Sequence, residues 1–144
     1  MPAAERTITI NQPPSAVFPV VADGTKAKLW RPGVLDVALA SGSGPGLGAT
    51  YRQGVRGPGG RRIDADYEVT AFEPDRRLAF RAIAGPVRPD GEFELEPIGA
   101  GTALTFRLRA ELGGWKRLVM GRAVQSSMDA EMAALDRLRD LLER

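Results

Sequence analysis

The sequence contains neither cysteine nor histidine among its 144 residues. Without cysteine the chain can form no disulfide, thiolate metal site or cysteine nucleophile, and it is compatible with a reducing compartment. Without histidine it lacks the commonest general base near neutral pH and the commonest zinc ligand, which excludes a Ser-His-Asp triad and a histidine-based metal site. Any chemistry must therefore use carboxylates, tyrosines, lysines, hydroxyl groups or water.

Long apolar runs are also missing from the sequence. No segment approaches the roughly 18 apolar residues that span a bilayer, and residues 1–11 do not have the apolar core of a signal peptide. We therefore expect a cytoplasmic protein with no stable membrane insertion. The 20 basic and 18 acidic residues leave a net charge of +2 and form no basic stripe, so we expect no nucleic-acid binding.

The composition is that of a globular protein, with 43% hydrophobic and 26% charged residues in a chain of the length of one domain. We expect residues 1–144 to form a single domain. Residues 7–10 are a predicted strand, and two short helical pieces follow it, the second capped by Asp23 and ended before Pro32. Six further strand patterns are separated by Gly/Pro turns that are too short for crossover helices. They cover residues 34–40, 49–55, 63–72, 78–84, 92–96 and 103–111.

The last segment is a predicted amphipathic helix from about Trp115 to Glu143. At about 100° per residue, one of its faces carries Met120, Val124, Met128, Leu135, Leu138 and Leu142, with Glu131 in the same stripe. Alternation along the strands likewise gives the sheet one apolar face and one charged face. Two such apolar surfaces bury each other, so we predict an α+β fold in which a curved, seven-stranded antiparallel sheet wraps around the C-terminal helix.

Several short motifs follow one another in a particular order: Ile8-Thr9-Ile10, Trp30-Arg31-Pro32-Gly33, Gly46-Leu47-Gly48, residues 67–74 (YEVTAFEP) and residues 101–106 (GTALTF). Together with the final helix, this order resembles the START-like, birch-pollen-allergen-like (SRPBCC) superfamily, and within it the polyketide cyclase/dehydrase-like group of small bacterial proteins. The resemblance implies the helix-grip fold, with a hydrophobic cavity between sheet and helix. Members of the superfamily carry lipids and sterols, cyclise aromatic polyketides, sense plant hormones or act as co-chaperones. They share no catalytic motif, so the fold does not decide the function.

Inward-facing side chains would line such a cavity and make it mostly apolar, with a few polar groups. Ordinary core packing is the alternative for each of them, because aromatic residues and methionines are common in cores. Trp30 could form a wall of the cavity or wedge the two short helical pieces onto the sheet. The candidate ligand-binding residues are Trp30, Tyr51, Gln53, Tyr67, Phe80, Phe93, Phe106, Met120, Val124 and Met128.

Glu131 is the candidate catalytic residue. If it faces the cavity without a cation, burial favours its protonated form, and it could transfer a proton or anchor a ligand hydroxyl. The alternative is that it lies outside the cavity or pairs with an arginine, because glutamate is rarely buried alone. Asp64 and Asp66 are predicted on the outer, solvated face. Because no set of oxygen ligands converges, neither a metal nor another cofactor is expected.

Three functions are compatible with these observations. The first is a carrier, sensor or accessory protein that binds a hydrophobic or amphipathic small molecule between sheet and helix. The second is an aromatic polyketide cyclase or dehydratase that uses Glu131 with Tyr51 or Tyr67 as acid and base. The third is an interaction module without a pocket, whose sheet surface binds a protein partner. A homodimer is compatible with all three.

Overall fold

The computed structural model describes residues 2–144, apart from the side chain of Pro58. Its strands form one antiparallel sheet in the order β1-β8-β7-β6-β5-β3-β2, and the short β4 pairs with β3. The strands are β1 (Ala3–Ile10), β2 (Val34–Ser41), β3 (Thr50–Arg56), β4 (Arg62–Asp64), β5 (Tyr67–Glu73), β6 (Arg77–Ala82), β7 (Asp90–Ile98) and β8 (Gly101–Arg109). The helices are α1 (Pro14–Ala22), the 3-10 helices η1 (Gly24–Leu29) and η2 (Pro58–Gly60), α2 (Gly114–Ala133) and α3 (Leu135–Leu142).

The two faces of the sheet have opposite chemistry. On the inner face, Phe93 of β7 lies opposite Phe106 of β8, and Leu95 lies opposite Leu104; all four side chains are buried. The outer face is a network of cross-strand ion pairs, each worth about 0–1 kcal/mol at an exposed site. These pairs join Arg107 to Glu5 and Glu92, Arg77 to Glu92, Arg81 to Glu68 and Arg109 to Asp90. Burial of the inner face is therefore the main source of stability.

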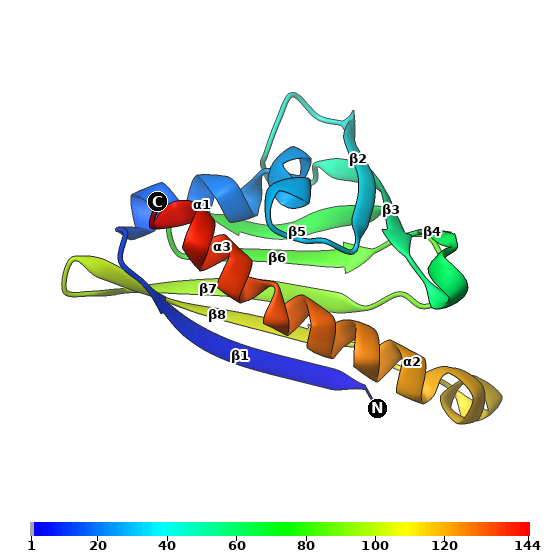
Figure 1. Ribbon diagram of the computed structural model, residues 1–144. Coiled ribbons are helices and arrows are strands. Elements are labelled where there is room, and N and C mark those ends of the chain that lie inside the picture. The colour runs from blue at the N-terminus through cyan, green and yellow to red at the C-terminus, as the bar shows by residue number, and fades with distance from the viewer. Residues whose placement is uncertain (1) are drawn as a thin grey trace.

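The C-terminal helical segment crosses this inner face, and Figure 1 shows it running diagonally in front of the sheet with α1 near its C-terminal end. It consists of α2 and α3, which meet at Ala134; the backbone of Ala134 stays helical, so the long C-terminal helix predicted for residues 115–143 is confirmed, with a local irregularity at this residue. The guanidinium of Arg6 lies at this irregularity and donates hydrogen bonds to the Met132 carbonyl at 3.0 Å and to the Asp136 carboxylate at 2.7 Å. Leu135 and Leu138 are fully buried beyond Ala134.

The predicted strand over residues 63–72 is wrong as one continuous strand. It consists of β4 and β5, separated at Ala65 and Asp66, which gives eight strands in place of seven. The backbone N–H of Ala65 donates to the backbone carbonyl of Gln53, and the backbone N–H of Gln53 donates to the Asp66 carboxylate. Asp66 is therefore half-buried against β3 and is not a solvated residue of the outer face. The predicted helical pieces are α1 and η1, and Asp23 caps η1 by accepting from the Thr25 amide at 3.0 Å.

Candidate functional site

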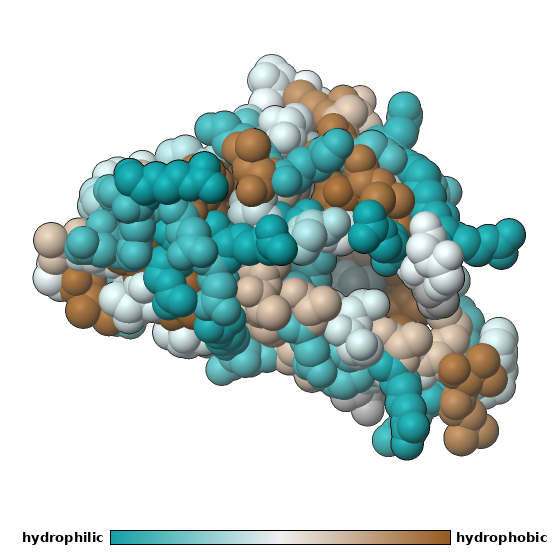
Figure 2. Space-filling model, in the orientation of Figure 1, coloured by the Kyte–Doolittle hydropathy of each residue, from teal (hydrophilic) through white to brown (hydrophobic). Residues whose placement is uncertain are grey.

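The helix leaves part of the inner sheet face uncovered. The sheet contacts of α2 and α3 are concentrated on β1, a strand at one edge. Tyr67 on β5 and Phe80 on β6 face inward and yet are only half-buried, whereas Phe93 and Phe106, nearer that edge, are buried. Figure 2 shows a hollow between α2 and the part of the molecule that contains β3 and β4. An open cleft therefore separates α2 from the middle of the sheet.

A row of five aromatic rings follows the inner face across β3, β5, β6, β7 and β8. Tyr51 stacks on Tyr67 with ring centroids 5.1 Å apart, and Tyr67 meets Phe80 at 5.6 Å. Phe80 is 6.2 Å from Phe93, which stacks on Phe106 at 4.2 Å. Contacts of this kind add about 0.5–1.5 kcal/mol each beyond the burial of their area. The row therefore forms an apolar wall with its middle facing the cleft.

Gly24 closes one end of this row. A Cβ atom at this position would lie 2.2 Å from Tyr67 Oη and 2.7 Å from Tyr51 Cδ1, which no side chain can tolerate without displacing a ring. Glycine is required here for the close approach of η1 to the two tyrosines. The Asp23 cap fixes the turn that brings the glycine to them.

Two buried polar atoms of the site have no hydrogen-bond partner among the described residues, namely Trp30 Nε1 and Tyr51 Oη. Trp30 is 3% exposed and packs edge-on against Phe93 at 6.2 Å, so it fixes the loop after η1 to the sheet. A buried donor without a partner costs about 1–3 kcal/mol, and native proteins have few of them. Each atom thus lacks an acceptor among the described residues, and because both are inaccessible to solvent, a ligand oxygen would reach them only if the side chains that cover them moved.

An ion pair joins this loop to the C-terminal helix. Arg31 Nε donates to Glu131 Oε2 at 2.6 Å, and Arg31 Nη1 donates to Gln53 Oε1 at 3.2 Å. Gln53 is itself buried and also donates to the Ala65 carbonyl. Glu131 is thus paired with an arginine, which was the alternative to an unpaired carboxyl group in the cavity. Burial alone would lower the pKa of Arg31, but the Glu131 carboxylate outweighs it and the pKa of Arg31 is raised.

The two tyrosines are neutral hydrogen-bond donors. Burial raises the pKa of the Tyr51 phenol, and it raises the pKa of the Tyr67 phenol strongly, although the cation of Arg31 opposes the shift at Tyr67. Neither phenol can therefore act as a base near neutral pH, and both can donate to a ligand.

The opposite wall of the cleft consists of α2. Met128 is buried, and Val124 packs against the core from a half-buried position. Met120 is half-buried one turn closer to the N-terminal end of the helix. Among the described residues, no three acidic side chains come together as metal ligands. The roles of all these residues toward a ligand stay predictions.

Comparisons with known proteins agree with this architecture. The family model described as polyketide cyclase / dehydrase and lipid transport matches residues 1–143. The chain belongs to this family. None of the curated proteins matches the chain.

Solved structures similar to this member of the family include TTHA0849 from Thermus thermophilus, with a TM-score of 0.81 at 19% identity over 98% of this chain and 97% of that one. The Zhui aromatase/cyclase from Streptomyces sp. R1128 has a TM-score of 0.72 at 20% identity, covering 99% and 93%. A START superfamily protein from Mycobacterium smegmatis has a TM-score of 0.74 at 16% identity, covering 96% and 98%. At these identities the likeness is one of fold, and it confirms the predicted helix-grip architecture.

Sequence reasoning did not identify Gly24 or Arg31 as site residues. Asp23 and Gly24 after α1 have the sequence of an ordinary helix cap and turn. No neighbouring residue indicates that the rings of Tyr51 and Tyr67 lie against the glycine. Arg31 occurs in the motif Trp30-Arg31-Pro32-Gly33, where the following proline holds it in an extended loop. Its partner Glu131 is 100 residues away in the chain, so only the fold shows the pair.

Proposed function

We propose that this protein binds a hydrophobic or amphipathic small molecule in the cleft between the sheet and α2. The observation that carries the proposal is the uncovered middle of the aromatic row, where Tyr67 and Phe80 stay half-buried on an inward face. A ligand in this position would remove their remaining apolar area from water, at about 25 cal/mol per Å². The family description, which includes lipid transport, supports the same function.

The polar atoms of the cleft indicate what the ligand must carry. Tyr51 and Trp30 offer donors without partners, whereas the Glu131 oxygen Oε2 is already occupied by Arg31. A ligand with a carbonyl, ether or hydroxyl oxygen on an otherwise apolar body would satisfy these donors. A pure hydrocarbon would leave them unpaired, at a cost of about 1–3 kcal/mol for each donor.

A second candidate function is acid–base catalysis of the cyclase or dehydratase kind. It is favoured by Glu131 Oε1, because among the residues described here only Oε2 of this carboxylate forms a hydrogen bond. In this mechanism Glu131 would accept a proton from a substrate carbon through Oε1 and return it to the oxygen that leaves as water, while Tyr51 and Tyr67 act as neutral donors to a ligand oxygen, not as bases. Glu131→Gln separates the functions: a carrier keeps most of its affinity, whereas a catalyst loses its rate.

The outer sheet face offers less support for a protein-interaction module. An open groove of about 730 Å³ has a lining that includes Arg77, Glu92 and Arg107, and it also reaches Phe80 of the aromatic row. These three side chains pair with one another at 2.7 and 3.1 Å. Their charges are therefore largely satisfied without a partner, in contrast to the donors in the cleft.

The test uses two flat probes of the same shape, fluorene and fluorenone, of which only fluorenone has a carbonyl oxygen. We expect calorimetric titration to show fluorenone binding about fivefold more tightly, because one neutral hydrogen bond is worth about 1 kcal/mol. Tyr51→Phe should remove this preference and leave fluorene binding unchanged. Thr105→Val, which deletes a hydroxyl group on the outer face, is the control. If neither probe binds, or if Tyr51→Phe binds both as the parent does, the proposed site is wrong.

A further inference from the structure

The first turns of α2 carry an apolar surface that the fold leaves in water. Trp115 is 67% exposed, Leu118 89% and Val119 73%. Their spacing of three and four residues places them on one side of the helix, opposite the stripe of Met120 and Val124 that faces the sheet. Figure 1 shows that this end of α2 projects past the start of β1, and Figure 2 shows the brown residues gathered there. We name Trp115, Leu118 and Val119 the apolar tip.

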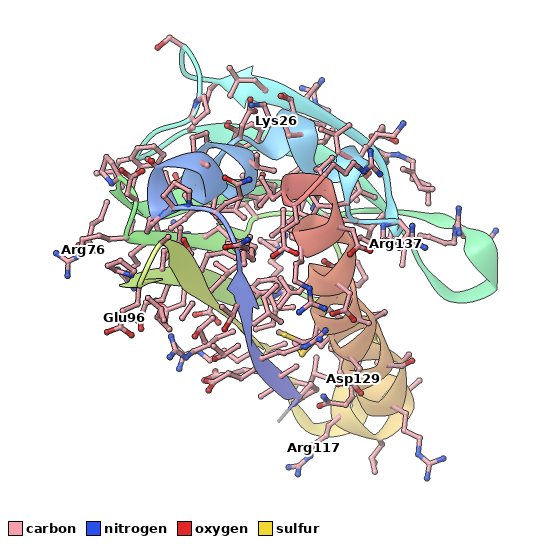
Figure 3. All side chains as sticks on the ribbon, turned by 60° about the vertical axis from the view of Figure 1, so that its left-hand side comes forward. Lys26, Arg76, Glu96, Arg117, Asp129 and Arg137 are labelled. Carbon is pink, nitrogen blue, oxygen red and sulfur yellow. The ribbon has the colours of Figure 1, made fainter. Side chains whose placement is uncertain are left out.

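Cations surround the apolar tip. Lys116, Arg117 and Arg122 lie on the same turns, and residues 112–128 contain no acidic side chain. Figure 3 shows Arg117 at the projecting end of the helix, far from Arg76 at the opposite end of the sheet. Lys116 Nζ donates to the Pro86 carbonyl, which ties the tip to the β6–β7 loop.

The β6–β7 loop adds Arg88 to this end of the molecule, and the β3–β4 hairpin adds Arg56 and Arg61. Within residues 2–144, none of these cations forms an ion pair, whereas the arginines Arg77, Arg81, Arg107 and Arg109 of the outer face all do. Glu111 is the acidic residue next to the tip along the chain. Lys26, Lys28 and Arg76 also form no ion pair among the described residues, so this end is distinguished by the combination of its cations with the apolar tip.

We propose that this end docks on an anionic lipid bilayer, with the apolar tip in the interfacial region and the surrounding cations against the headgroups. An exposed tryptophan with neighbouring leucine and valine has the chemistry of residues that enter the bilayer interface, and flanking arginines and lysines add attraction to anionic lipid. Docking is peripheral, because no described helix is long and apolar enough to cross a bilayer. The hollow of Figure 2 lies at the same end of the molecule as the tip, so docking would bring the cleft near the membrane, a consequence that rests on the proposed function.

The test is co-sedimentation of the full chain with vesicles, without added ligand. We expect binding to vesicles of equimolar phosphatidylcholine and phosphatidylglycerol, weak binding to phosphatidylcholine alone, and a decrease with salt. The chain has two tryptophans, and Trp30 is buried, so a blue shift and quenching by brominated lipid report on Trp115. Each cation near the surface contributes about fivefold in partitioning, so Arg117→Gln with Arg122→Gln should lower it about thirtyfold.

Leu118→Glu with Val119→Glu should abolish binding at no cost to folding, because both side chains are exposed. Matched controls lie elsewhere: Leu47→Glu, at 71% exposure in the β2–β3 loop, and Arg76→Gln should bind as the parent does. Equal binding to both vesicles, no binding, or a tip variant that binds normally overturns the proposal. A dimer in ultracentrifugation that Leu118→Glu dissociates also overturns it, because the tip is then a subunit interface. Fluorenone titration without vesicles tests the cleft separately, so the two proposals can fail independently.

Discussion

Gly24→Ala is the substitution that tests the site geometry most directly. The new Cβ would lie 2.2 Å from Tyr67 Oη and 2.7 and 2.9 Å from two ring carbons of Tyr51. The half-buried Tyr67 ring can turn away, but Tyr51 is 1% exposed and has no space to move into. Overpacking of this kind costs about 1–3 kcal/mol, and the lower chain entropy of alanine returns about 0.4–1 kcal/mol. We expect a net loss of about 1–2 kcal/mol.

Gly121→Ala is the matched control, because a Cβ at this position of α2 meets no atom within 4 Å. Alanine in a helix interior is favoured over glycine by about 1 kcal/mol, so this variant should be stabilised. Urea denaturation should therefore move the two midpoints in opposite directions, and thermal unfolding should shift by about 3 °C per kcal/mol. Fluorenone affinity should fall in Gly24→Ala alone. If Gly24→Ala is as stable as the parent, the close contact between η1 and the tyrosines is not real.

Two further predictions concern the polar groups of the cleft. The chain has only two tyrosines, and both lie in the site. In an ultraviolet titration, phenolate should therefore form at a higher pH in the native protein than in the protein unfolded in urea. Coincident titration curves for the two states would contradict the burial of the tyrosines. Because the folded pKa of each phenol is raised above the unfolded value of about 10, their contribution to stability is complete below about pH 10 and is lost as the pH rises through the folded values. Arg31→Met should destabilise the protein by about 2 kcal/mol, because Glu131 loses its cation at a site where both side chains are about 20% exposed, and adding Glu131→Leu should restore most of the loss. A double variant in urea denaturation that stays as unstable as Arg31→Met would show that the pair is not the cause.

The sheet and the helix could be predicted from the sequence because their signals are local. Alternation places Phe93 and Leu95 on one face, and short Gly/Pro turns permit only antiparallel neighbours. The helical stripe places Met128, Leu135 and Leu138 inward, and all three are buried. The irregularity at Ala134 could not be predicted in this way, since alanine is the best helix former and the guanidinium that bonds to the Met132 carbonyl beside it belongs to Arg6, more than 120 residues earlier in the chain.

The cleft chemistry depends on contacts that no local pattern encodes. Alternation indicated that Tyr51 and Gln53 face inward, and both do. It could not show that Gly24 lies against the Tyr51 ring, or that Glu131 meets Arg31, because η1 and the following loop have no periodicity that fixes their direction. The division between β4 and β5 was missed for the same reason: Asp66 fits an alternating strand, and only the fold shows that its carboxylate accepts from the backbone N–H of Gln53 on β3.

One property of α2 connects the cleft with the apolar tip. A helix that followed the sheet closely would bury its apolar stripe along its whole length and cover Tyr67 and Phe80. Instead α2 follows β1 at the sheet edge and extends past it, so Met128 is buried while Trp115 and Leu118 remain in water. The direction of the α2 axis therefore has two consequences. It leaves the middle of the aromatic row uncovered, and it leaves the side chains of the apolar tip without a protein partner. Apolar surface without a partner lowers the solubility of a protein. The position of the apolar tip near the cleft, with cations around it, is best explained by binding to a surface that is both apolar and anionic.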